Sequence, residues 1–160
     1  MDHPKAIGDR TTLAVMLALS DAGYAISVPF GENTRYDLVA DNGERLLKVQ
    51  CKTGRLRGGA VFFRPSSSYA HHASPRQTRR RYEGEIDFFG VYCSETGVVF
   101  LVPIEDVATT WMASLRVEPA RNSQKKRIRL AADYEIATVK APRLVTQAPR
   151  ASSDARGSCA

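Results

Sequence analysis

Three polar residues near the middle of the chain have the types and spacing of a site that hydrolyses phosphodiesters. Asp37 precedes the dipeptide Asn42-Gly43, and Gln50 and Lys52 follow it. Such hydrolysis at neutral pH requires a cation that neutralises the phosphate and lowers the pKa of the attacking water. Mg²⁺ takes oxygen ligands and usually only one or two carboxylates. The Asp37 carboxylate, the Gln50 amide oxygen and the Cys51 main-chain carbonyl would supply such ligands, and Lys52 would orient the water or stabilise the pentavalent phosphate.

A tight β-hairpin over residues 35–41 and 44–52 is predicted to bring these residues together. Asn42-Gly43 between two alternating apolar runs is the strongest short signal for a two-residue hairpin loop, because both loop positions require positive φ. This loop places Asp37 opposite Lys48 and makes Asp37 and Gln50 diagonal neighbours, about 7–8 Å apart. Side chains alternate along a strand, so the opposite face is predicted to lie in the core, with Tyr36, Leu38, Leu47, Val49 and Cys51.

Two of these polar residues also have a simpler interpretation. Asp37 could form a surface ion pair across the strands with Lys48, and Lys52 could solvate the end of a strand. The convergence of three polar groups on one face, beside a continuous apolar face, favours a functional site.

Asp9 is a further candidate, on a helix predicted to begin at residue 4 or 9 and to end at Gly23. Leu13 and Met16 follow it at helical spacing, so Asp9 is predicted to share the inward face of this helix. An inward acid is costly unless it is paired or bound to a metal. The alternative is that Asp9 caps the helix, since Asp is among the preferred N-cap residues.

The order of these segments resembles the PD-(D/E)XK group I intron homing endonucleases. Tyr36-Asp37 corresponds to the Pro-Asp of the motif, and Gln50-x-Lys52 corresponds to its (D/E)-x-K part with an amide at the acidic position. The short motif alone is weak support, but further segments match the family in order, at residues 5–9, 23–24, 28–31, 82–92 and 115–119.

The resemblance implies a Mg²⁺-dependent endonuclease, with Mn²⁺ as a substitute, that acts on double-stranded DNA as a homo-oligomer, dimer or tetramer. It implies an α/β, restriction-endonuclease-like core (αβββαβ), with a central mixed sheet flanked by helices. The implied catalytic residues are Asp37, Gln50, Lys52 and Asp9, and the implied metal ligands are Asp37, Gln50, Cys51 and Asp9. Two alternatives remain open: a catalytically silent DNA-binding protein, of which Gln50 would be the sign, and a structure-selective nuclease of the Holliday-junction resolvase kind.

Basic residues form two clusters downstream of the predicted hairpin. The formal net charge of +6 and the pI of about 9.5 suit a polyanionic partner. Basic runs are usually solvated faces, but beside a phosphodiester site they predict salt-sensitive contacts with the DNA backbone. Arg35 is expected either on a phosphate or beside the Gln50 strand. The predicted DNA-binding residues are Arg35, Arg79, Arg80, Arg81, Lys125, Lys126 and Arg127.

The rest of the chain predicts one domain over residues 1–140 and a disordered tail over residues 141–160, which are rich in Ala, Pro, Ser and Arg. Strands are expected near residues 24–30, 60–63, 86–93 and 97–102, a helix at 103–113, and either a helix or irregular structure at 128–136. Phe88-Phe89 and Trp111-Met112 are candidates for an oligomer interface or for the core.

The cysteine count and the apolar runs indicate the compartment. Three cysteines without metal-ligand spacing, and no secretion signal, predict a reducing cytoplasm, with association to the nucleoid when DNA is bound. No apolar run is long enough to predict a membrane span.

Overall fold

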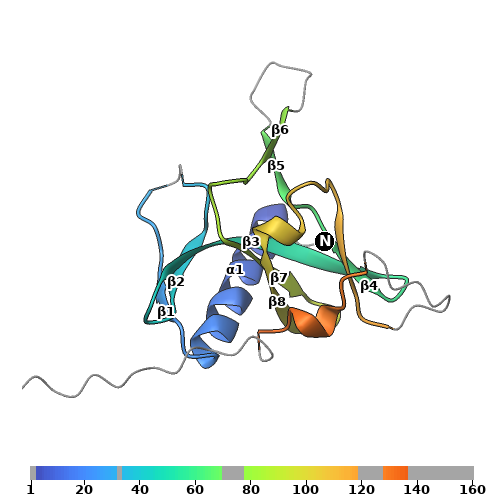
Figure 1. Ribbon diagram of the computed structural model, residues 1–160, viewed down its shortest axis with the longest axis horizontal. Helices are drawn as coiled ribbons and strands as arrows, with labels where there is room; N and C mark the ends of the chain where they lie inside the picture. The colour runs from blue at the N-terminus through green and yellow to red at the C-terminus, as the bar shows by residue number, and fades with distance from the viewer. Residues whose placement is uncertain (1–2, 32–33, 70–77, 119–127, 137–160) are drawn as a thin grey trace, which may run out of the picture.

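The computed structural model describes residues 3–31, 34–69, 78–118 and 128–136 of the 160-residue chain. In these ranges one α-helix packs against a seven-stranded mixed sheet, and a two-stranded ribbon projects from the sheet (Figure 1). None of the helical segments described is long and apolar enough to span a membrane. The predicted tail at residues 141–160 lies outside the described residues.

Five strands form a chain of antiparallel neighbours in the sheet, and two more join it through a parallel pair. The antiparallel neighbours are, in order, β1 (Ala25–Ser27), β2 (Leu38–Asp41), β3 (Leu46–Arg57), β4 (Ala60–Phe63) and β9 (Ala113–Arg116). The parallel partner of β3 is β7 (Phe88–Cys93), which pairs in turn with β8 (Val98–Pro103). The projecting ribbon consists of β5 (Ser66–Tyr69) and β6 (Thr78–Arg81). This mixed sheet with its packed helix confirms the restriction-endonuclease-like fold class.

The helix α1 spans Pro4–Asp21 and ends where the sequence predicts. Proline is favoured in the first turn, where its missing N–H is not needed. At the other end Gly23 has φ 90°, and the N–H of Tyr24 donates to the carbonyl of Leu19 at 3.0 Å. This left-handed glycine with a bond back to the last turn is a Schellman-type end.

The inward face of α1 differs from the prediction. Thr11, Val15 and Leu19 are the buried residues of the helix, whereas Asp9 is exposed and Leu13 is 65% exposed. Asp9 is not the N-cap either, because the helix begins at Pro4. The helix lies too close to β7 for large side chains to separate them: a Cβ at Gly90 would stand 2.6 Å from a methyl group of Val15.

Two apolar clusters cover the two faces of the sheet. Beneath α1, Val15 and Leu19 pack with the β2 and β3 residues Leu38 and Val49. Phe89 belongs to the opposite cluster and is 1% exposed, so the Phe88-Phe89 segment is core rather than interface. Its neighbours there are Phe63, Tyr82, Phe100, Val102 and Leu115.

The β2–β3 hairpin forms, but in a register that differs from the predicted one. Leu38 pairs with Val49, so Asp37 lies opposite Gln50 and not opposite Lys48. The loop is longer than two residues, because the Asn42 side-chain oxygen accepts hydrogen bonds from the main-chain N–H groups of the two residues after Gly43, at 2.9 and 2.8 Å. A shift by two residues keeps every side chain of the paired strands on its predicted face.

Most of the predicted core face of this hairpin is confirmed. Leu38, Leu47, Val49 and Cys51 are buried under α1. Tyr36 is the exception: it packs against the cluster on the other face, because β2 begins only at Leu38 and the chain before it leaves the sheet.

The segment at residues 103–113 is not the predicted helix. It forms a single 3₁₀ turn at Ile104–Asp106 and then runs to β9. The β-branched Val107, Thr109 and Thr110 disfavour helical continuation, and Val107 is fully buried in the cluster opposite α1. The segment before Ile136 is likewise mostly irregular, with one 3₁₀ turn at Ala131–Asp133.

Candidate active site

The long strand β3 has an open stretch along one edge, between two different partners. Val49 pairs with both β2 and β7, so these strands lie on opposite edges of β3. The β4 register places Phe63 opposite Gly54, which already pairs with Cys93 of β7, so β4 must lie on the β2 edge. The β2 pairing reaches Val49 and the β4 register reaches Gly54, so residues 50–53 have no partner on that edge among the described strands. Figure 1 shows β2 and β4 toward opposite ends of β3.

Asp37 closes the β2 end of this open stretch. Its main-chain N–H donates to the Val49 carbonyl at 3.0 Å, which continues the ladder one step past β2. Its Oδ2 then accepts hydrogen bonds from the Cys51 main-chain N–H at 2.7 Å and from Gln50 Nε2 at 2.6 Å. The corrected register brings Asp37 and Gln50 into direct contact, closer than the predicted diagonal placement.

Oxygen atoms converge around the Gln50 amide. Gln50 Nε2 lies 2.6 Å from Asp37 Oδ2 and 3.4 Å from the Cys51 carbonyl oxygen. The Gln50 Nε2 group, a donor with partial positive charge, therefore lies near both the Asp37 carboxylate and the Cys51 carbonyl oxygen. Hard cations such as Mg²⁺ take this set of donors, since carboxylate, amide and carbonyl oxygens are their usual protein ligands. The residues present at the edge of β3 thus fit a divalent cation.

The electrostatic surroundings of Asp37 do not fully compensate its charge. Burial raises the pKa of the Asp37 carboxyl above its ordinary value of 3.8, although the Cys51 N–H and the charge of Lys52 oppose this effect. Burial, with the adjacent Asp37 charge, also raises the pKa of the Cys51 thiol to about 12. The thiol therefore stays protonated at neutral pH, and the ligand that Cys51 offers is its main-chain carbonyl.

Lys52 lies on the same face of β3 as Gln50 and is held by two neutral acceptors. Its Nζ donates to the Ser66 carbonyl and to the Tyr82 hydroxyl, both at 3.1 Å. The same amine lies 4.9 Å from the centre of the Tyr82 ring. Neither acceptor is charged, so these two contacts position the amine beside the open edge without forming an ion pair.

Tyr82 and Ser66 are the site residues that the sequence did not single out. Ser66 belongs to a serine run without a catalytic arrangement, and its contribution is a main-chain carbonyl, which no side-chain pattern indicates. Tyr82 had a usable signal, since an aromatic residue directly follows the basic run that ends at Arg81.

Arg35 lies at the base of the β5–β6 ribbon. Its Nε donates to Glu85 Oε2 at 2.7 Å, its Nη1 to Ser67 Oγ at 2.9 Å and its Nη2 to the Arg81 carbonyl at 2.9 Å. The guanidinium also stacks on the Tyr82 ring at 4.1 Å. Through these contacts Arg35 fixes the β5–β6 ribbon, and its predicted contact with a phosphate stays a prediction.

The other predicted DNA contacts are placed in part. Arg80 is exposed and pairs with Glu85, and the Arg81 guanidinium lies 4.7 Å from the centre of the Trp111 ring. The side chain of Arg79 and the residues Lys125, Lys126 and Arg127 lie outside what the structure describes.

Asp9 is exposed on α1, not on its predicted inward face, and its predicted role as a metal ligand stays a prediction. Among the described helix residues that contact β3 is Thr11, whose Oγ1 lies 2.8 Å from Thr53 Oγ1. Across the described ranges, no three or more His, Cys, Asp or Glu side chains gather as a metal cluster would require. The carboxylate placed at the edge of β3 by described contacts is that of Asp37, together with neutral oxygens.

Comparisons with known proteins agree with this geometry. The family model described as PD-(D/E)XK endonuclease matches residues 2–137. The solved structure of a bacterial homing endonuclease, I-Ssp6803I, is similar over 85% of this chain and 90% of that chain, with a TM-score of 0.65 and 21% sequence identity. At that identity the likeness concerns the fold. The comparison with proteins of curated function found no significant match.

Proposed function

Because the chain belongs to the PD-(D/E)XK endonuclease family, we propose that it is a metal-dependent enzyme that hydrolyses phosphodiester bonds in double-stranded DNA. The observation that carries this proposal is the open edge of β3. There the Asp37 carboxylate accepts from the Gln50 amide, which lies 3.4 Å from the Cys51 carbonyl oxygen, and the acceptors of the Lys52 ammonium among the described residues are neutral.

The proposed cofactor is Mg²⁺, with Mn²⁺ as a substitute. Asp37, Gln50 and the Cys51 carbonyl would hold it, and when bound it would neutralise the phosphate and lower the pKa of a coordinated water. The Cys51 N–H fixes the Asp37 carboxylate through a 2.7 Å hydrogen bond. The protein thus orients the Oδ2 oxygen of this carboxylate with its own backbone.

Lys52 has the donor capacity for a phosphate oxygen. An ammonium has three N–H donors, and Ser66 and Tyr82 take two of them. The third has no acceptor among the described residues and would serve a non-bridging oxygen of the scissile phosphate, where a fixed positive charge stabilises the developing negative charge of the transition state. The two neutral acceptors keep the amine in place.

Gln50 distinguishes this site from one with two carboxylates. An amide oxygen coordinates a hard cation but contributes no charge. We therefore expect weaker Mg²⁺ binding and a higher Mg²⁺ optimum than in a variant with glutamate at position 50. In the free protein the amide donates to Asp37, so it must rotate to present its oxygen to a cation.

A single site cuts one strand, so cutting a duplex commonly requires a symmetric oligomer. We propose that the protein acts as a homo-oligomer. Leu13 and Leu17 on the outer face of α1 are 65% and 64% exposed and provide apolar surface for such a contact. Light scattering of the purified protein at micromolar concentration, with and without DNA, tests this part of the proposal.

The nuclease proposal is tested by incubating the purified protein with supercoiled plasmid, linear duplex and a four-way junction, each with Mg²⁺ and with EDTA. We expect nicking or linearisation of plasmid only when Mg²⁺ is present. Binding without any cleavage, at every Mg²⁺ and Mn²⁺ concentration, would instead identify a silent DNA-binding protein. Cleavage confined to the junction would identify a structure-selective nuclease.

A further inference from the structure

A cavity of about 710 Å³ opens directly beside Lys52. It lies along the β3–β4 hairpin and reaches the segment that leads into β9. Lys52 lines the cavity, and so does Ser66, whose carbonyl holds the Lys52 amine. The cavity is therefore continuous with the open edge of β3, and its volume is within the usual range of ligand sites.

The charged side chains that line the cavity are all basic. Its lining includes Lys52, Arg55, Arg57 and Arg64, and no acidic side chain from the described residues. Arg57 and Arg64 are exposed, and neither forms an ion pair within the part of the chain that the structure describes. Arg55 has a loose exposed contact, 3.9 Å from Glu95, and such surface pairs contribute little.

These arginines differ from those near the β5–β6 ribbon. Arg35 and Arg80 share the carboxylate of Glu85, which compensates one of their two positive charges. Arg57 and Arg64 have no carboxylate partner among the described residues, and like charges that are not compensated attract a polyanion.

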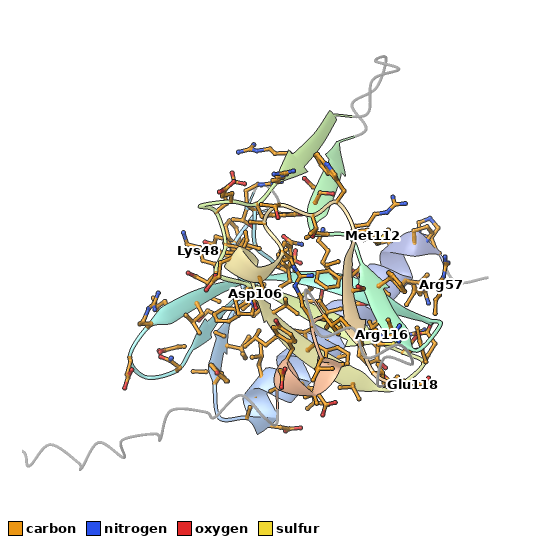
Figure 2. The ribbon with its side chains drawn as sticks, turned by 45° about the vertical axis from the view of Figure 1, so that its right-hand side comes forward. Lys48, Arg57, Asp106, Met112, Arg116 and Glu118 are labelled. Atoms are coloured by element: carbon orange, nitrogen blue, oxygen red, sulfur yellow. The ribbon has the colours of Figure 1, made fainter. Side chains whose placement is uncertain are left out.

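The floor of the cavity is apolar. Phe62 is half-buried in it, and Met112 is 48% exposed at its margin. Figure 2 shows Arg57 and Met112 on one side of the molecule and Lys48 on the other. Arginines above an apolar floor match the two parts of a nucleotide, a charged phosphate and a sugar or base with an apolar face.

We propose that this cavity binds the DNA strand next to the scissile phosphodiester. Arg57 and Arg64, with Arg55, contact successive backbone phosphates, and Phe62 and Met112 contact the sugar or base between them. This inference rests on the proposed function, since the scissile phosphate is placed at Lys52. It adds a path for the substrate strand that runs along the β3–β4 hairpin.

The test is DNA binding by fluorescence anisotropy, with a fluorescein-labelled duplex oligonucleotide in EDTA, so that no cleavage occurs. The double variant Arg57→Ala/Arg64→Ala should weaken binding about tenfold or more at about 0.1 M salt, and the slope of log K against log salt should become shallower by about two. The matched control is Arg45→Ala/Lys48→Ala, which removes the same charge at the opposite end of β3 and should change affinity and slope much less. Melting temperatures establish that all variants are folded.

Two further variants separate charge from packing. Arg57→Lys/Arg64→Lys should keep the wild-type salt slope, because the charge is retained. Met112→Ala should weaken binding severalfold without changing the slope, because it removes an apolar contact; an unchanged affinity would overturn the assignment of the floor.

An Arg57→Ala/Arg64→Ala variant that binds like the wild type, or no more weakly than the control, would overturn the proposed path even if the wild type cleaves DNA. The opposite outcome is distinct. If the two arginine substitutions weaken DNA binding but the wild type never cleaves DNA with Mg²⁺, the proposed strand path stands and the proposed nuclease activity is contradicted.

Discussion

Asp37 and Glu85 are two partly buried carboxylates, and the cations near them, Lys52 and Arg35, both contact Tyr82. The two carboxylates differ in how far the protein compensates their negative charge. Glu85 receives the guanidinium groups of Arg35 and Arg80, and the hydrogen bond from Arg35 lowers the pKa of the Glu85 carboxyl below its usual value. Asp37 receives a main-chain N–H and an amide, and burial raises its pKa despite the charge of Lys52.

The difference separates a structural group from a ligand. Glu85 is neutralised by the protein and fixes the base of the β5–β6 ribbon through the arginines it binds. Asp37 is held in position by neutral donors, so its negative charge remains available to a cation from outside. Neutral hydrogen bonds orient a carboxylate without cancelling its charge, and a metal ligand requires that combination.

The difference between Asp37 and Glu85 is tested most strongly by removing the cation near each of them, Lys52 and Arg80. Lys52→Ala removes the ammonium beside Asp37, and we expect DNA cleavage to fall by about 10³-fold, because a positive charge aimed at the transition state is lost. Arg80→Ala removes an exposed cation from Glu85 and should leave the rate within about threefold. The measurement is the single-turnover cleavage rate of each variant, with the DNA equally bound in both cases. Equal rates for both would mean that Lys52 is as structural as Arg80.

Gln50 sharpens the comparison, because it can be changed into a second carboxylate. Gln50→Ala should lower cleavage by about 10²-fold, since a ligand oxygen is lost beside Asp37. Gln50→Glu should keep activity and lower the Mg²⁺ concentration at half-maximal rate, because it adds negative charge to the cation site. A Mg²⁺ titration of initial rates measures both. Wild-type behaviour of Gln50→Ala across the titration would remove Gln50 from the site.

Tyr82 connects the two regions, since Lys52 bonds its hydroxyl and Arg35 stacks on its ring. Tyr82→Phe removes the hydroxyl and keeps the ring. We expect a decrease of a few fold in the cleavage rate, little change in DNA affinity, and a melting temperature close to that of the wild type. If the variant instead unfolds at much lower temperature while its rate per folded molecule is unchanged, Tyr82 belongs to the ribbon alone.

The smallest expected effect concerns stability in EDTA. At neutral pH the ionised Asp37 opposes folding, because its pKa is higher in the folded than in the unfolded chain; Asp37→Asn should therefore raise the melting temperature slightly. The pKa of the Glu85 carboxyl is lowered in the folded protein, so its ionised form favours folding, and Glu85→Gln should lower the melting temperature by a few degrees. The Glu85 contribution is present above its unfolded pKa and should disappear as the pH falls through its lowered folded value. Calorimetry between pH 3 and 7 (a range of roughly four units around these carboxyl values) measures both, and shifts of equal sign would contradict the comparison.

Local patterns predicted individual elements, whereas the restriction-endonuclease-like fold was implied by the resemblance to a family. Alternating apolar residues define β3, Gly23 ends the helix, and Gln50 and Lys52 share the face that alternation gives them. The predicted register of the β2–β3 hairpin was wrong because the Asn42 side chain accepts two main-chain hydrogen bonds and so stabilises a longer loop. The Asn-Gly signal does not reveal this longer loop.

Features that depend on packing between distant segments could not be predicted. The open edge of β3 exists because β2 and β4 pair with different ends of β3, while β7, distant in the sequence, pairs with the opposite edge over residues 49–54. Asp9 was misplaced because the approach of α1 to Gly90 selects the face with the smaller side chains. The acceptors of Lys52 come from β5 and from the turn after β6, and their side chains carry no catalytic signature.

The most direct measurement is the nicking of supercoiled plasmid by the wild type, Asp37→Asn and Glu85→Gln, each in Mg²⁺ and in EDTA. If the open edge of β3 is a metal-dependent nuclease site, the wild type and Glu85→Gln nick the plasmid in Mg²⁺, neither does so in EDTA, and Asp37→Asn is inactive in both although it remains folded. Cleavage by Asp37→Asn at the wild-type rate, or robust cleavage by the wild type in EDTA, would contradict the assignment.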